Sequence, residues 1–262
     1  MAEQLLDEFG RQAANMDAAP AFKQEKALRR ICAALGPAPI GRVLELACGP
    51  GIVAEAIAPL VSELLCIDAT PEMLALAKAR IEKTGLSNVT FQKAFAEALP
   101  FGAAEFDVIV TRLSFHHFND IQTILAECRR VLRPHGRLVT ADVISSVNRE
   151  ESTLHNALEQ LRDPTHVHMF SRPEFLITLH AAGFEPTFEE SWEQHRCFSE
   201  WARIVAVPGR TEPLREVMRT LSRSGIHAGI QLHEAGGDIQ FIHTWLLVAA
   251  ELIISEDTEQ TV

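Results

Sequence analysis

Short apolar runs alternate with amphipathic stretches between Gly41 and Val143. The apolar runs have the length and residue types of strands, whereas the stretches between them repeat apolar residues at helical spacing. This alternation predicts a parallel sheet with helices on both faces. The five strands expected in this part are residues 42–48, 63–68, 89–94, 106–112 and 136–143.

The clearest helix boundaries follow the second of these strands. Thr70 is a typical N-cap residue, Pro71 suits the first helical position, and Gly85 ends the pattern. Another helix is expected to begin near Asn119 and to end before Pro134. Both helices connect consecutive strands, as the alternating pattern requires.

Two further regions flank this core. Residues 3–35 are predicted to be helical and, because they precede the first strand, are free to lie across the ligand edge of the sheet. Residues 184–192 and 238–251 are expected to form two more strands, separated by about 45 mostly helical residues that include a helix at 211–224. An insertion between the last two strands is well placed to cover a pocket.

Charge and composition narrow the range of partners. The chain has 35 acidic and 24 basic residues, and its net charge of -11 gives no attraction to nucleic acid or to anionic membrane surfaces. No run approaches the roughly 20 apolar residues that span a bilayer, and no signal peptide is recognisable. The five cysteines form no C-x-x-C pair, which suits a reducing cytosol. We expect a cytoplasmic protein, either a monomer or a homodimer.

A glycine-containing turn follows the first strand, with the sequence Glu-Leu-Ala-Cys-Gly-Pro-Gly at 45–51. Glycines at a strand-to-helix turn let a ligand approach the backbone closely, because no Cβ stands in the way. Asp68 ends the second strand 19 residues after Gly49, where its carboxylate can accept hydrogen bonds from two ribose hydroxyls. The turn and the acid together predict a nucleoside site.

The residues of this turn leave two nucleoside ligands open. Residues 49–54 also satisfy the G-x-G-x-x-G/A pattern of dinucleotide sites, so an NAD-linked oxidoreductase is one alternative. Glu45 favours S-adenosylmethionine (SAM), because a carboxylate suits the ammonium of a methionine moiety and matches a pyrophosphate poorly. The chain also has no tyrosine, which excludes the Tyr-Lys pair of short-chain dehydrogenases.

Residues 42–146 resemble the class I SAM-dependent methyltransferases, most closely the branch of the ubiquinone and menaquinone biosynthesis methyltransferases. The motifs that match in order are the acidic glycine loop at Glu45, Ala47, Gly49 and Gly51, the ribose acid Asp68, the Thr-Pro-Glu-Met-Leu run at 70–74, the adenine-side segment 96–101, the segment 112–120 after the fourth strand, and the run 131–136. Phe9 to Gln12 resemble a lid motif of the same branch.

This resemblance implies a Rossmann-like α/β fold, with a seven-stranded, mostly parallel sheet and helices on both faces. One domain is expected, consisting of an N-terminal helical lid (1–40), a SAM-binding core (41–146) and acceptor-side elements with the last two strands (147–262). The cofactor would be SAM, and the product S-adenosylhomocysteine. The implied cofactor-binding residues are Glu45, Ala47, Gly49, Gly51, Asp68, Ala69, Met73, Phe95, Ala96 and Arg112.

Two positions depart from the family pattern. Ala47 replaces the first glycine of the loop, and its methyl group narrows the approach to the methionine tail. Phe95 replaces the usual Asp, Asn or Thr that would hold the adenine amino group. The base is then expected to be held by ring packing and by backbone groups of Phe95 and Ala96.

Histidines are the candidate bases, since methyl transfer needs alignment and, for a protonated acceptor atom, removal of a proton. His116 and His117 follow the fourth strand, where open α/β sheets present reactive groups, and we expect His116 to be the base and His117 to pack. His166 lies in a segment that resembles one found after the fifth strand in relatives and is expected to line the acceptor pocket. No metal is expected at His166 and His168, because no further ligand stands at a convincing spacing.

The sequence therefore predicts transfer of a methyl group to an oxygen or carbon of a small apolar or aromatic molecule. Residues 111–115 lack the motif that nucleic-acid amino-methyltransferases carry after the fourth strand, which argues against a DNA or RNA acceptor. Two alternatives remain open, the NAD-linked oxidoreductase and a SAM-binding regulator without turnover.

Overall fold

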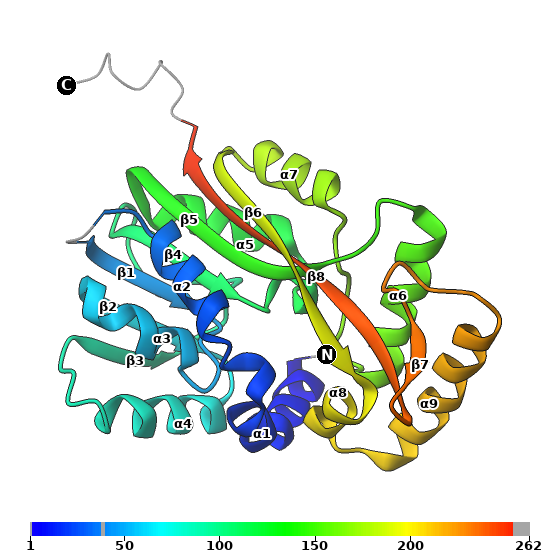
Figure 1. The fold of residues 1–262 in the computed structure, drawn as a ribbon. Helices are drawn as coiled ribbons and strands as arrows, with labels where there is room; N and C mark the ends of the chain where they lie inside the picture. Colours follow the sequence, from blue (N-terminus) through cyan, green and yellow to red (C-terminus); the bar gives the residue numbers. More distant parts are fainter. Residues whose placement is uncertain (1, 38–39, 254–262) are drawn as a thin grey trace.

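The computed structural model describes residues 2–37 and 40–253, and its centre is a twisted eight-stranded sheet (Figure 1). The main strand order is β3-β2-β1-β4-β5-β8-β6, with β7 paired to β8 outside this path. The strands are β1 (Ile40–Leu46), β2 (Val61–Asp68), β3 (Val89–Lys93), β4 (Phe106–Arg112), β5 (Leu132–Ile144), β6 (Phe184–Cys197), β7 (His233–Ala235) and β8 (Asp238–Leu252). Strands β1 to β5 pair in parallel, whereas β8 is antiparallel to both β5 and β6, so the expected Rossmann-like fold is confirmed.

Helices cover both faces of the sheet. The α-helices are α1 (Ala2–Ala18), α2 (Glu25–Ala34), α3 (Ile52–Ile57), α4 (Pro71–Glu82), α5 (Ile121–Val131), α6 (Arg149–Arg162), α7 (Arg172–Ala181), α8 (Phe198–Val205) and α9 (Pro208–Arg223), and the 3-10 helices are η1 (Pro20–Phe22), η2 (Ala58–Leu60) and η3 (Phe115–His117). Val43 of β1 packs in the layer of α2, α3 and α4, whereas the next residue, Leu44, packs in the layer of α5 and α7. Alternate residues of each central strand are therefore buried on opposite faces, as in parallel sheets covered on both sides.

The strand β8 extends beyond the two layers. Its later residues, such as Leu246 and Val248, belong to the main core, whereas Ile239 and Phe241 pack with α6, α8 and α9 in a separate hydrophobic cluster. This cluster holds the insertion between β6 and β8 against the end of the sheet where α1 also lies (Figure 1). None of the helices in the described ranges is long and apolar enough to cross a membrane.

The structure differs from the sequence-based prediction at several element boundaries. Strand β5 begins at Leu132 rather than at 136, directly after α5, and a register shift opposite β4 accommodates the extra residues. Helix α9 begins at Pro208, three residues before the expected start, and Val207 is its N-cap residue. Strand β7 adds an eighth strand, and its three exposed residues carry no alternating pattern that would have predicted it.

Candidate active site

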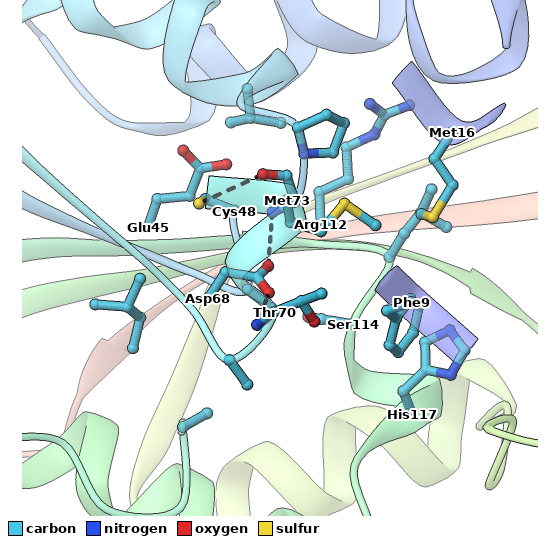
Figure 2. A pocket seen from close by; sticks show the side chains of 18 of the residues that line it. Phe9, Met16, Glu45, Cys48, Asp68, Thr70, Met73, Arg112, Ser114 and His117 are labelled. Carbon is cyan, nitrogen blue, oxygen red and sulfur yellow. Dashed lines mark hydrogen bonds between the residues drawn. The ribbon is translucent and has the colours of Figure 1, made fainter. Parts of the chain in front are cut away.

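A cavity of about 1020 Å³ lies at the carboxyl ends of β1 to β4 (Figure 2). Nine of the ten expected cofactor residues line it, namely Glu45, Ala47, Gly49, Asp68, Ala69, Met73, Phe95, Ala96 and Arg112. These residues come from four strand ends that are far apart in sequence but adjacent in the sheet. The tenth residue, Gly51, does not line the cavity.

The loop after β1 contains three residues in the left-handed region. Ala47 has a φ of 50°, which costs a non-glycine residue conformational energy, whereas Gly49 and Gly51 reach 52° and 77° without that cost. A Cβ on Gly49 would meet no atom within 4 Å, so this residue faces open space. A Cβ on Gly51 would lie 2.9 Å from the Cα and Cβ of Ala77, so Gly51 allows the loop to pack against α4. The two glycines therefore have different structural roles.

Asp68 is held in one orientation by its own neighbourhood. Its two carboxylate oxygens accept hydrogen bonds from the backbone N–H groups of Gly49 and Thr70, both at 2.8 Å. Burial raises the pKa of Asp68, and these two donors partly offset the effect. The carboxylate is thus fixed beside the glycine loop before any ligand binds.

Glu45 and Arg112 bring a buried acid and a buried guanidinium to the same cavity. Burial raises the pKa of Glu45 to about 8, and its only hydrogen bond within the described residues is a weak one from the Cys66 thiol at 3.6 Å. Arg112 donates from Nη1 to the Phe22 carbonyl oxygen at 2.7 Å, while its buried Nε and Nη2 have no partner in the described chain. An acid without a strong donor and a guanidinium with two unpaired nitrogens suit a ligand that carries both an ammonium and a carboxylate.

His116 forms a buried pair with Asp142, a residue that the sequence analysis did not single out. The Nδ1 of His116 donates to Asp142 Oδ1 at 2.6 Å, and the same carboxylate accepts from the backbone N–H groups of Phe115 and Val143. Burial opposes protonation of His116, but Asp142 outweighs it and raises the pKa of the imidazole. One signal was present, since Asp142 is the single acid in the apolar strand β5.

His117 and His166 have other partners. The Nδ1 of His117 donates to the Thr165 carbonyl oxygen at 3.0 Å, and burial together with His116 lowers its pKa to about 4. Figure 2 shows the His117 ring beside Phe9 of α1, with ring centroids 4.9 Å apart. The Nε2 of His166 donates to Asn156 Oδ1 at 2.8 Å, and burial lowers its pKa to about 3. Contrary to expectation, His166 lines neither this cavity nor the neighbouring one.

Comparison with known proteins identifies the family. Residues 44–140 match the family model described as a methyltransferase domain. The uncharacterized methyltransferase YcgJ of Bacillus subtilis is 30% identical over 211 residues, which cover 79% of this chain and 83% of YcgJ. The chain belongs to the methyltransferase family.

Solved structures agree with this assignment. The YcgJ protein superposes on the methyltransferase with a TM-score of 0.82 and 26% identity, over 88% of this chain and 100% of that one. A putative methyltransferase from Bacillus halodurans C-125 gives a TM-score of 0.81 and 25% identity, over 86% and 98%. A ubiquinone biosynthesis O-methyltransferase of Cereibacter sphaeroides is 32% identical over 117 residues, 45% of each chain. The family resemblance noted in the sequence and the prediction of a SAM-dependent methyltransferase are both confirmed.

A second cavity of about 630 Å³ adjoins the first in the methyltransferase. The two cavities share Phe9, Met16, Phe22, Leu113 and His117, so they meet at these side chains. His116 lines the second cavity but not the first, together with Arg196 of β6, Trp201 of α8, and His243 and Trp245 of β8. The fold therefore places a second binding space directly beyond the cofactor residues.

Helix α1 covers both cavities of the methyltransferase. Gln12 Nε2 donates to Asp163 Oδ2 at 3.2 Å, and Asn15 Nδ2 donates to the Ile204 carbonyl oxygen at 3.3 Å. On the other side, Asp17 forms an ion pair with Arg80 of α4. The helix thus bridges the core and the insertion, in the position expected of a lid.

One side-chain group in the described chain has metal-ligand chemistry. The ligand atoms of His155, Glu159 and His243 lie within 4.8 Å of one another, and all three residues are buried. Glu159 already accepts from Arg162 at 2.9 Å, and this guanidinium places a positive charge beside the group. His166 and His168, the pair considered from the sequence, bond separately to Asn156 and Glu174.

Proposed function

We propose that the methyltransferase transfers the methyl group of SAM to an oxygen or carbon of a small, apolar or aromatic molecule. The observation that carries this proposal is the pair of adjoining cavities. The first has ionisable groups that complement the cofactor, and the second combines aromatic and apolar side chains with a smaller number of polar and charged ones. Ribose hydroxyls would bond to Asp68, and the adenine would lie between Met73, Phe95 and Ala96. The methionine moiety would place its ammonium at Glu45 and its carboxylate at Arg112.

The two charged residues distinguish this ligand from a dinucleotide. A zwitterionic amino acid satisfies both the buried acid Glu45 and the unpartnered nitrogens of Arg112. NAD offers no ammonium at that position, and its anionic pyrophosphate would keep the Glu45 carboxyl in its neutral form. The NAD-linked alternative therefore leaves Glu45 unexplained.

The second cavity supplies the groups that act on the acceptor. SAM would supply a methyl group bonded to a sulfonium sulfur, and the electron pair of that bond would stay on the sulfur when the methyl group is transferred. His116 would remove the acceptor's proton at Nε2, because its Nδ1 is engaged by Asp142. Asp142 would stabilise the imidazolium that forms. Rings of Phe9, Phe22 and Trp245 would exclude water around the transferring group.

Calorimetry with S-adenosylhomocysteine and NAD tests this proposal. We expect micromolar binding of S-adenosylhomocysteine and none of NAD. Because the Glu45 pKa is about 8, this carboxyl is largely protonated at pH 7, and a bound ammonium favours its charged form. Binding below pH 8 should therefore release a proton, which appears as a heat that depends on the buffer's ionisation enthalpy.

Two variants complete the calorimetric experiment. Glu45→Gln should abolish the proton release and weaken binding by about 10- to 150-fold, the range for a hydrogen bond to a charged group. Glu82→Gln, at an exposed position on α4, should change neither quantity. Micromolar NAD binding in place of S-adenosylhomocysteine binding would contradict the proposal. Turnover, measured as S-adenosylhomocysteine formed with a panel of acceptors, separates an enzyme from a SAM-binding regulator.

A further inference from the structure

The second cavity contains hydrogen-bond donors that the protein itself does not use. Arg196, at the end of β6, has a side chain only 7% exposed, and its Nε and Nη2 have no hydrogen-bond partner within the described residues. The buried indole N–H groups of Trp201 and Trp245 also lack an acceptor there. All three residues line this cavity. Its wall therefore offers donors to whatever binds inside it.

The acidic groups of the second cavity are already engaged elsewhere. Glu159 accepts from Arg162 at 2.9 Å and lies 3.2 Å from His243 Nε2. Asp163 accepts from the backbone N–H and the hydroxyl of Thr165, at 2.9 and 2.6 Å. Neither acid therefore bonds to the Arg196 guanidinium, and Glu159 acts on it only through its charge.

Glu200 is the acid nearest to Arg196, and it forms a long ion pair that lies beyond hydrogen-bond distance. Its Oε2 is 3.9 Å from the Arg196 Nε, and its Oε1 has no partner in the described chain. Burial lowers the pKa of Arg196, with Glu200 opposing and Arg162 adding to the effect, but a guanidinium remains charged at neutral pH. A buried charge without hydrogen bonds is costly, so such a residue is expected to have a partner in the working complex.

We propose that the methyl acceptor is a carboxylate, and that Arg196 binds its carboxylate group. This inference rests on the proposed function, since it assigns the occupant of the same second cavity. The two free nitrogens, Nε and Nη2, form one edge of the guanidinium, which matches the two oxygens of a carboxylate in a bidentate pair. Trp201 lines the same cavity and has a further N–H without a partner in the described chain. The acceptor's apolar body then extends toward Leu113 and Phe22, where the two cavities meet.

The first test needs no ligand. If Arg196 lacks a protein partner, Arg196→Met removes an uncompensated buried charge and should raise the melting temperature of the free protein. Arg203→Met, at an exposed position on α8, is the matched control and should leave it unchanged. A lower melting temperature for Arg196→Met, reproduced by Glu200→Gln, would show that Arg196 and Glu200 pair in solution and would overturn the inference.

The second test compares matched ligands in protein saturated with S-adenosylhomocysteine. The probes are benzoate, phenylacetate and cinnamate, each against its carboxamide, with phenyl phosphate as a further anion, and binding is measured by ligand-observed NMR. We expect at least one carboxylate to bind about tenfold or more tightly than its amide, and Arg196→Met but not Arg203→Met to remove this preference.

Each other outcome of the second test has a defined meaning. Equal binding of acids and amides, or no binding of any carboxylate at millimolar concentration, would overturn the inference and leave the proposed function in place. Tighter binding of phenyl phosphate than of any carboxylate would overturn the choice of a carboxylate. Failure of S-adenosylhomocysteine itself to bind would instead contradict the proposed function.

Discussion

The hydrogen bond between His116 and Asp142 determines which imidazole nitrogen is available. Because the carboxylate accepts at 2.6 Å, Nδ1 carries the proton, and the neutral ring keeps its lone pair on Nε2. His116 lines the second cavity, where the acceptor is proposed to bind, and Nε2 is therefore the nitrogen that would take the acceptor's proton. His117 lacks this arrangement, since a backbone carbonyl group and not a carboxylate engages its Nδ1.

His116→Ala should separate catalysis from cofactor binding. We expect kcat to fall by about 10²- to 10⁴-fold, the usual contribution of a general base, while the affinity for S-adenosylhomocysteine stays nearly unchanged. His117→Ala should act mainly on stability or cofactor affinity, because its ring packs against Phe9. An equal loss of kcat and of cofactor affinity in His116→Ala would show that His116 is a binding residue. These measurements require an acceptor that must lose a proton.

The same pair gives a pH dependence with a definite sign. His116 acts as a base only when neutral, and Asp142 raises its pKa above the ordinary value of 6.5. The rate should therefore fall as the pH falls through that raised pKa. Asp142→Asn removes the charge that raises it, so the acid limb of the profile should move to lower pH, which a pH series of kcat tests directly.

The sequence predicted the cofactor cavity better than the acceptor cavity. Glu45, Asp68 and Arg112 lie at strand ends in a fixed order, and a parallel sheet brings such ends to one edge. Asp142 and Arg196 lie near the ends of the long strands β5 and β6, but no motif precedes or follows them, and their meeting with distant side chains depends on tertiary packing that no local pattern encodes. His166 does not line either cavity for the same reason, because its hydrogen bond to Asn156 fixes the orientation of the imidazole ring.

At the scale of elements, the turn from β1 to α3 combines two requirements. Gly49 leaves room in the cavity, whereas Gly51 leaves room for the α4 backbone at Ala77. Both residues have positive φ, so any substitution there adds backbone strain as well. Gly85, after α4, has the same kind of backbone with a φ of 73° and no atom within 4 Å of an added Cβ.

Alanine at these three glycines should distinguish the two requirements. Gly85→Ala should cost about 1 kcal/mol of unfolding free energy from backbone strain alone. Gly49→Ala should cost a similar amount but also weaken S-adenosylhomocysteine binding, since its Cβ enters the ligand space. Gly51→Ala should cost about 2 to 4 kcal/mol, because overpacking against Ala77 adds to the strain. Equal unfolding free energies for Gly51→Ala and Gly85→Ala, measured by denaturant titration, would contradict this reading.

Element boundaries were predicted less well than the elements themselves. Gly136 and Pro134 indicated a loop before the fifth strand, yet β5 starts at Leu132, which pairs with Phe106 of β4. The cost of including a proline is small there, since the β-bulge relaxes the pairing at this point. Only Leu132 pairs there, and the next paired residue is Arg137, so the turn signal at Pro134 and Gly136 marks an irregularity inside the strand rather than a loop before it.

For the whole molecule, α1 joins the core to the acceptor side and lines both cavities. This helix bonds to the core through Asp17 and to the acceptor side through Gln12 and Asn15. It also contributes Phe9 and Met16 to both cavity walls. We therefore propose that a ligand enters or leaves when these contacts open, as expected of the lid that the sequence resemblance implied.

Amide hydrogen exchange tests the lid. Exchange in residues 9–15 should slow when S-adenosylhomocysteine is added, because the bound ligand stabilises the closed position of α1. Exchange in α5, on the far face of the sheet, serves as the internal control and should change little. Full protection of residues 9–15 without ligand would show that α1 is a permanent part of the fold.

The position of β8 also determines when the sheet can be completed as the chain is synthesised. Strands β1 to β5 pair with one another, so this part of the sheet can assemble as it leaves the ribosome. Strand β6 emerges earlier than β8 but pairs with it alone among the described strands, and therefore waits without a sheet neighbour. Because β8 also brings His243 and Trp245 to the second cavity, a nascent chain stalled before Asp238 would have the donor half of the enzyme and an unfinished acceptor half.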